Sequence, residues 1–166
     1  MKKLFLSAFV LVAIAIQAQA QKSVTSIITV KIPEALDLQV TNGNTVDFDF
    51  TSNLALLTSG IEKQNAVILS YKANKPWFVN IAATTSNFTG GDAANPMPSS
   101  VIQFKNNASG TYAPLSTTSV SLSGTSSAKN PKGESTIGID YKLTPGFTYP
   151  SASDYSIGIT YTISTI

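Results

Sequence analysis

Alternation of apolar and polar side chains dominates this sequence, and helical periodicity is almost absent. In the two clearest stretches, 136–143 and 155–163, every second residue is apolar or aromatic. Successive side chains of a β-strand point to opposite faces, so a period of two is typical of strands with one buried face. Such runs recur about every 8–12 residues, with Gly, Pro, Asn and Ser between them. We therefore predict an all-β chain, an antiparallel immunoglobulin-like β-sandwich of about eight to ten short strands.

Residues 1–20 are predicted to be a signal peptide rather than part of this fold. A short positively charged start precedes an apolar run over 4–16, and an A-x-A cleavage site ends at Ala20. The run is shorter than the ~20 residues that a membrane span needs. We expect cleavage after Ala20, a single domain over 21–166, and no transmembrane segment in the mature chain. The protein is then secreted or reaches the extracellular cell surface via the periplasm.

The residue types that are missing exclude many kinds of catalysis. The chain has no Cys and no His, and all 11 of its basic residues are Lys. Nucleophilic triads usually need a His base, zinc sites normally need His or Cys, and bidentate phosphate recognition needs Arg. Removing the two signal lysines leaves nine Lys against nine Asp plus Glu, so no basic surface for nucleic acid is expected. We expect no enzyme, no catalytic residues, no cofactor and no metal; the alternative is a hydrolase that uses carboxylates alone.

One pair of carboxylates needs a separate interpretation. Asp47 and Asp49 share a face of a strand predicted over 45–50, and oxygen ligands of this kind suit Ca²⁺. Phe48 and Phe50 occupy the other face of the same strand. We therefore interpret the two aspartates as its solvent-facing side.

Trp77 is the only tryptophan and a candidate core anchor. It has the same parity as Val79 and Ile81, which the alternation places inside. If it were exposed, its ring could stack on a sugar instead. Residues 67–81 form either one strand kinked near Pro76 or a hairpin, and the sequence does not separate these alternatives.

The segment directly after the predicted cleavage site carries the most informative pattern. Its alternate positions are Val24, Ser26, Ile28, Val30 and Ile32. One interpretation is an ordinary first strand of the chain's own sandwich. The other is a donor strand that pairs with an open sheet edge of the next subunit, with main-chain hydrogen bonds for affinity and alternate side chains in pockets. A head-to-tail interface of this kind does not close, so it builds a filament.

Both ends of the chain resemble a family of bacterial surface fibres. The segment SIITVKIPEALDL (26–38) resembles the mature N-terminus of alternate chaperone–usher, colonisation-factor type, fimbrial subunits. The segment PSASDYSIGITYTI (150–163) is similar to their closing strand. The resemblance implies an immunoglobulin-like sandwich without catalytic residues, with Val24, Ile28, Val30 and Ile32 as donor positions. It also implies identical subunits, a periplasmic chaperone and an outer-membrane usher as partners.

Two other secreted sandwiches fit less well. Many spore coat protein U-like domains carry a disulfide, whereas this chain has no Cys. WxL-type domains need repeated Trp-x-Leu, and here only Trp77-Phe78-Val79 stands in that place.

We therefore expect an exported, non-enzymatic structural or adhesive surface protein. In its sharper form this is a fimbrial subunit that assembles by donor-strand exchange through its N-terminal strand. The alternative is a monomeric secreted β-sandwich module that binds a glycan or a protein.

Overall fold

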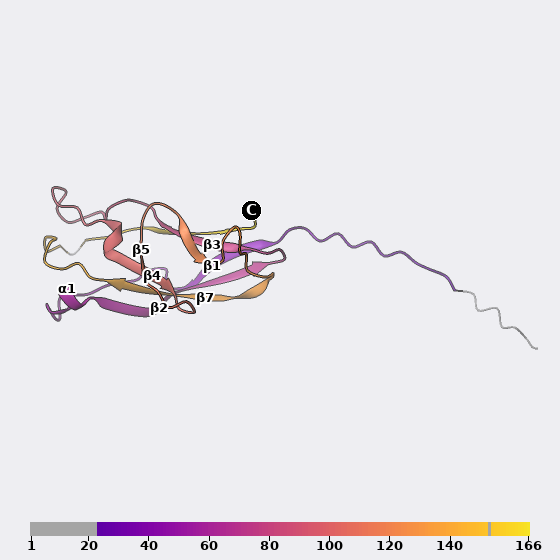
Figure 1. Ribbon diagram of the computed structural model, residues 1–166, viewed down its shortest axis with the longest axis horizontal. Coiled ribbons are helices and arrows are strands. Elements are labelled where there is room, and N and C mark those ends of the chain that lie inside the picture. The colour runs from indigo at the N-terminus through magenta and orange to yellow at the C-terminus, as the bar shows by residue number, and fades with distance from the viewer. Residues whose placement is uncertain (1–22, 153) are drawn as a thin grey trace, which may run out of the picture. The chain divides into compact units, whose positions relative to one another are not determined.

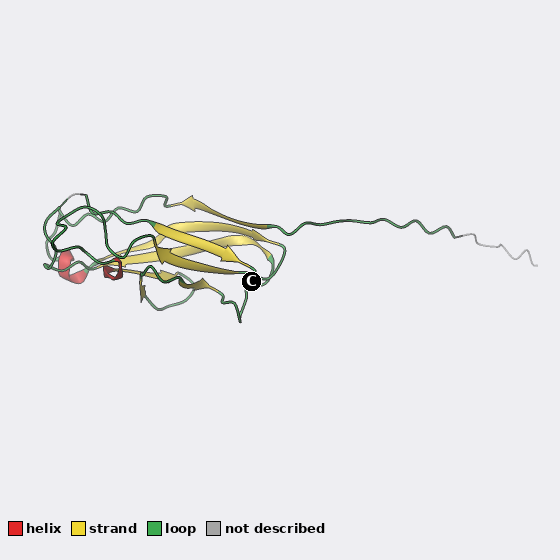
Figure 2. Cartoon of the chain, turned by 90° about the horizontal axis from the view of Figure 1, so that it is seen from above, coloured by secondary structure: helices red, strands yellow, loops and turns green. Residues whose placement is uncertain are grey.

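The computed structural model describes residues 23–152 and 154–166, so the predicted signal peptide lies outside the described residues. Within this part of the chain eight strands form two antiparallel sheets, and helices are confined to two short turns (Figures 1 and 2). The five-stranded sheet has the order β1-β2-β7-β4-β5 and the three-stranded sheet the order β6-β3-β8. This architecture confirms the predicted all-β sandwich.

The elements are, in chain order, β1 (Leu36–Asn42), α1 (Leu56–Ser59), β2 (Ile61–Ala73), β3 (Phe78–Ala83), the 3₁₀ turn η1 (Ser99–Val101), β4 (Ile102–Asn106), β5 (Ala113–Pro114), β6 (Val120–Ser123), β7 (Gly133–Leu143) and β8 (Ile159–Ser164).

The core lies between the two sheets and follows the predicted alternation. On β7 the apolar row Ile137, Ile139, Tyr141 and Leu143 is buried, as the period of two requires. These residues form one cluster with buried side chains of both sheets, including Leu69 of β2, Ile81 of β3 and Leu122 of β6. The cluster lies within one compact unit, Pro33–Ile166.

Residues 67–81 take neither of the two expected forms. The chain leaves the five-stranded sheet at Ala73 and enters the three-stranded sheet at Phe78. β2 pairs with β1 and β7, whereas β3 pairs with β6 and β8, so the two segments are not a hairpin. Pro76 cannot donate to a ladder and lies in the corner between them. The shared parity arises because Leu69 and Val79 reach the same core from opposite sheets.

Two other stretches with clear alternation form no strand. Residues 45–50 keep the predicted faces, with Phe48 and Phe50 half-buried and Asp47 and Asp49 exposed, but they belong to no ladder. Residues 23–32 also carry no secondary structure, and every one of them is exposed. The strand expected over 24–32 is therefore not formed within either sheet.

Candidate functional site

Two strands from different sheets each offer a free edge. Within the part of the chain that the structure describes, β1 pairs only with β2, and β8 pairs only with β3. β1 and β8 also approach each other across the sheets. At one end of this approach the Thr165 hydroxyl donates to Oε1 of Glu34 over 3.0 Å. The free edges of both sheets are thus neighbours, and free edges are where an added strand can pair.

The apolar rows beside these edges are incompletely covered. The inward residues of the last strand and its approach are Ile157, Ile159, Tyr161 and Ile163, and those of β1 are Leu36, Leu38 and Val40. All seven pack against the core but remain half-buried. By contrast, β7 lies between β2 and β4, and each residue of its inward row, from Ile137 to Leu143, is at most 6% exposed. A strand with a partner on both sides is covered on both sides, whereas β1 and β8 have a partner on one side only.

The five residues predicted as donor positions all lie in the exposed segment 23–32. Among their side chains, Val24 is 95% exposed, Ile28 85%, Val30 72% and Ile32 77%, and Ser26 is exposed as well. Ile27, which points to the other side of the alternation, is 88% exposed. Polar residues lie between these exposed apolar side chains. A large exposed apolar surface commonly marks an interaction site.

Asn74 fixes the backbone that joins this segment to β1. Its backbone N–H donates to the Ala35 carbonyl over 3.1 Å, and its side-chain Oδ1 accepts from the Ala35 N–H over 2.9 Å. Its Nδ2 donates to the Pro33 carbonyl over 2.7 Å. We call these three bonds to residues 33–35 the Asn74 clamp. Nothing in the local sequence indicates this role of Asn74, because the bonds join positions about forty residues apart in the sequence.

Glu34, inside the clamped stretch, adds two further ties. Its carboxylate forms an ion pair with Lys75 and accepts the bond from Thr165 at the end of the chain. Hydrogen bonds from Lys75 and Thr165 hold the pKa of Glu34 below its usual value. The start of β1 is therefore tied to the corner after β2 and to the end of β8.

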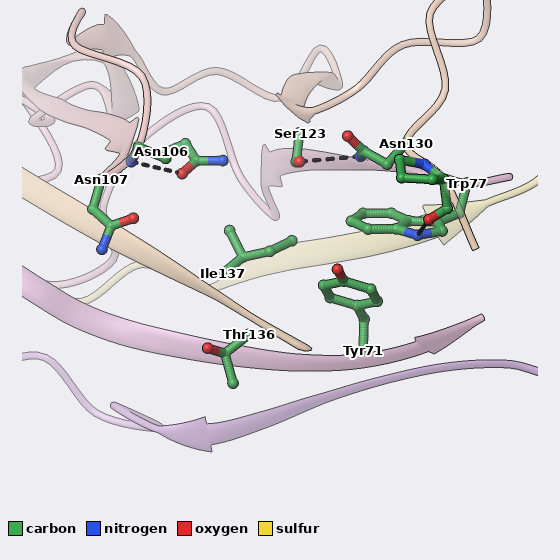
Figure 3. A pocket seen from close by; sticks show the side chains of 10 residues that line it. Tyr71, Trp77, Asn106, Asn107, Ser123, Asn130, Thr136 and Ile137 are labelled. Carbon is green, nitrogen blue, oxygen red and sulfur yellow. Dashed lines mark hydrogen bonds between the residues drawn. The ribbon is translucent and has the colours of Figure 1, made fainter. Parts of the chain in front are cut away.

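Trp77 is buried in the core, 2% exposed, and forms one wall of a small pocket (Figure 3). Its Nε1 donates to the Pro131 carbonyl over 2.9 Å, and its ring centroid lies 4.1 Å from that of Tyr71. The pocket has a volume of about 220 Å³, and its lining side chains are uncharged. Because so little of the indole is exposed, it offers almost no free face on which a sugar could stack. The pocket suits at most a small neutral polar group.

Three asparagines of this pocket already bond within the protein. The Asn130 Nδ2 donates to Ser123 Oγ over 3.1 Å, and the Asn107 Nδ2 donates to Asn65 Oδ1 over 2.7 Å. Asn106 accepts from the Ala108 N–H over 3.0 Å and donates to the Leu122 carbonyl over 3.2 Å. These bonds shape the pocket wall and use part of its capacity to bind a ligand.

A buried polar network on the outer face of the five-stranded sheet was not expected from the sequence. Asp140 of β7 is only 4% exposed and accepts from the Asn65 N–H over 2.7 Å. Lys105 of β4 lies 3.4 Å from the Asp140 carboxylate and 3.8 Å from that of Glu62. The Lys105 ammonium also lies 4.6 Å from the ring centroid of Tyr112. One ammonium shared by two carboxylates is a structural ion-pair arrangement, which we interpret as holding the irregular part of β2.

The remaining carboxylate candidates lie apart from this network. Asp47 and Asp49 are exposed. Asp49 accepts from both the N–H and the hydroxyl of Thr51, over 2.8 and 2.6 Å, and these bonds lower its pKa. Among the described residues there is no group of three or more Asp, Glu, His or Cys that could hold a metal ion.

No protein-family model matches the sequence, and no curated protein matches it. The fold therefore defines the class: an all-β sandwich with a five-stranded and a three-stranded antiparallel sheet. None of the helices in 23–152 and 154–166 is long and apolar enough to cross a membrane.

Proposed function

We propose that this protein is an exported, non-enzymatic structural or adhesive subunit of a bacterial cell-surface fibre. Copies assemble head to tail: residues 24–32 of one copy add a strand between the free edges of β1 and β8 of the next. One observation carries this proposal. The same chain combines an exposed apolar segment with two neighbouring strand edges whose apolar rows are half-covered.

The chemistry of the two surfaces is complementary. Val24, Ile28, Val30 and Ile32 supply a row of branched side chains at strand spacing. The rows beside β1 and β8 are also aliphatic or aromatic. Fully burying such a side chain contributes roughly 1.5–3 kcal/mol, and main-chain bonds to two edges add affinity that does not depend on side-chain identity.

The proposed partners follow from the same surfaces and from the family resemblance. Uncovered strand edges and exposed apolar segments promote aggregation unless another chain covers them. A periplasmic chaperone would cover them before assembly, and an outer-membrane usher would be the site where subunits join. No nucleic acid or cofactor has a part in this proposal.

Substitution of Ile28 tests the proposal, with Ile27 as the matched control. Ile28→Asp places a carboxylate where the donor strand contacts the next subunit's core, whereas Ile27→Asp places it on the opposite side of the same strand. We expect Ile28→Asp to abolish multimers and Ile27→Asp to retain them. Both variants should fold, because residues 24–32 belong to neither sheet. Ile27→Asp should unfold at the wild-type temperature, whereas Ile28→Asp should unfold at a lower temperature, because no donor strand stabilises its open edges. Equal assembly by both variants would contradict the proposal.

A second candidate function is a monomeric secreted module that binds a glycan or a protein. The uncharged pocket beside Tyr71 and Trp77 favours it. Titration with neutral sugars should then change Trp77 fluorescence, and the chain should remain a monomer. Multimers together with unchanged fluorescence would count against this candidate.

A further inference from the structure

We propose that the Asn74 clamp directs residues 24–32 to a second copy of the chain and away from the chain's own free edges. This inference rests on the proposed function and concerns how that same site is controlled. Strand addition within one copy would close the sandwich and end assembly. In a chain that carries both a donor segment and its acceptor edges, some structural feature must therefore make insertion into a second copy more favourable than self-insertion.

The clamp continues the β1–β2 ladder beyond its last assigned pair. Leu36 pairs with Ala73, and the next residue on each side, Ala35 and Asn74, are joined by hydrogen bonds from both Asn74 N–H and Ala35 N–H. The Asn74 side chain then reaches one residue further, to the Pro33 carbonyl. The backbone of residues 33–35 is thus held in line with β1.

This alignment opposes self-insertion. β1 runs from the clamp toward Asn42, so for residues 24–32 to lie along β1 of their own chain the backbone must reverse direction before it reaches Leu36. A hairpin loop takes about two or three residues, and only a loop of three before Pro33 places the even-numbered residues of 24–28 opposite the even-numbered inward residues of β1. With 33–35 held by Asn74, the reversal falls on the residues just before Pro33 and removes Ile32 and Val30 from the inserted strand. Self-insertion then uses only Val24, Ser26 and Ile28, whereas a second copy receives all five positions.

The ties of Glu34 act in the same direction. Its ion pair with Lys75 and its bond from Thr165 hold the middle of the clamped stretch to both sides of the site. A turn at 33–35 would have to break these contacts as well as the three bonds of Asn74. Loss of Asn74 alone removes the two side-chain bonds that immobilise Pro33 and Ala35.

The test compares the mature chain, 21–166, with three variants, using light-scattering mass and thermal unfolding. Asn74→Ala removes both side-chain bonds of the clamp, and Asn74→Asp keeps the acceptor for Ala35 N–H but loses the donor to Pro33. Asn95→Ala is the control, because it removes one loop-to-loop bond, from Asn95 Nδ2 to the Thr148 carbonyl. We expect wild type and Asn95→Ala to form multimers. Asn74→Ala should raise the single-subunit fraction severalfold, and Asn74→Asp should lie between.

Thermal unfolding of the double variant shows whether the new monomer has inserted its own segment. Adding Ile28→Asp to Asn74→Ala should lower the unfolding temperature of that monomer, because Ile28 is then inside its own sandwich.

If Asn74→Ala and Asn74→Asp form multimers as wild type does, the clamp inference is overturned and the proposed function stands. If the wild-type chain is itself a monomer that Ile28→Asp leaves unchanged, the proposed function fails and the inference fails with it. If Asn74→Ala does not fold, the single-subunit fraction of Asn74→Asp is compared with that of Asn95→Ala, and equal fractions overturn the clamp inference.

Discussion

Tyr141 and Tyr161 join the two sheets through hydroxyl groups that lie 2.7 Å apart. Tyr141 is on β7 and Tyr161 on β8, so this bond crosses the core beside the proposed acceptor edge. Burial raises the pKa of both phenols above their ordinary value of about 10. A raised pKa means that the folded state keeps protons that the unfolded state loses in alkaline solution.

The pair should therefore make stability depend on alkaline pH. Its contribution is fully present below about pH 10 and decreases as pH rises above the pKa of an unfolded tyrosine. Between about pH 8 and about pH 11, the free energy of unfolding measured with urea should decrease more for wild type than for the double variant Tyr141→Phe/Tyr161→Phe. The double variant removes both hydroxyls together, so neither is left without a partner, and little change is expected at neutral pH. Equal losses in the two proteins would contradict this assignment.

Gly138 gives a second test at the scale of single residues. A Cβ at this position would lie 2.2 Å from Asn65 Oδ1 and 2.4 Å from Asn107 Nδ2, so the bond between those two side chains could not persist unchanged. Gly138→Ala should lower the free energy of unfolding by about 1–3 kcal/mol. Gly110→Ala is the matched control, because nothing lies within 4 Å of its Cβ position. Urea denaturation measures the free energy of unfolding of the two variants. Equal values would contradict the close packing of Gly138 against the Asn65–Asn107 bond.

At the scale of elements, the alternation predicted which face is apolar better than which segments form ladders. β7 covers the strand predicted over 136–143, and its inward row is buried. Residues 24–32 and 45–50 also alternate yet form no strand. Side-chain periodicity depends on one segment alone, whereas a ladder also needs a free edge on another segment.

The same limit explains which parts of the candidate site the sequence could indicate. The alternation indicated the five candidate donor positions, because their prediction depends only on the pattern within one short segment. It could not identify the clamp at Asn74 or the pairing of Lys105 with Asp140, because both depend on strand register between distant residues. Asp140 looked like an ordinary solvent-facing residue of β7, and only the register places an ammonium beside it.

The proposed donor segment and its acceptor can be tested as separate elements. A chain that begins at Pro33 keeps the whole core cluster, so it should fold, although with the rows of β1 and β8 still half-covered. A synthetic peptide of residues 23–33 in excess should bind this chain and raise its unfolding temperature, because a ligand of the folded state stabilises it. The same peptide with Ile28→Asp is the control and should give no increase. No increase with either peptide would contradict the proposed pairing.

At the scale of the whole molecule, the core is fully buried, whereas the apolar rows beside two sheet edges are only partly covered. The core cluster spans both sheets, whereas the half-buried rows follow β1 and β8. An apolar segment of matching chemistry is exposed in the same chain. In the proposed assembly the segment of each copy serves the next, so the assembly would be heterologous and open and would give a linear fibre rather than a closed dimer.

The light-scattering mass of residues 21–166, the predicted mature chain, expressed alone, tests this central claim most directly. We predict a ladder of subunit multiples that survives mild detergent, because main-chain pairing and buried apolar side chains hold each junction. A stable, monodisperse monomer at all accessible concentrations would contradict it.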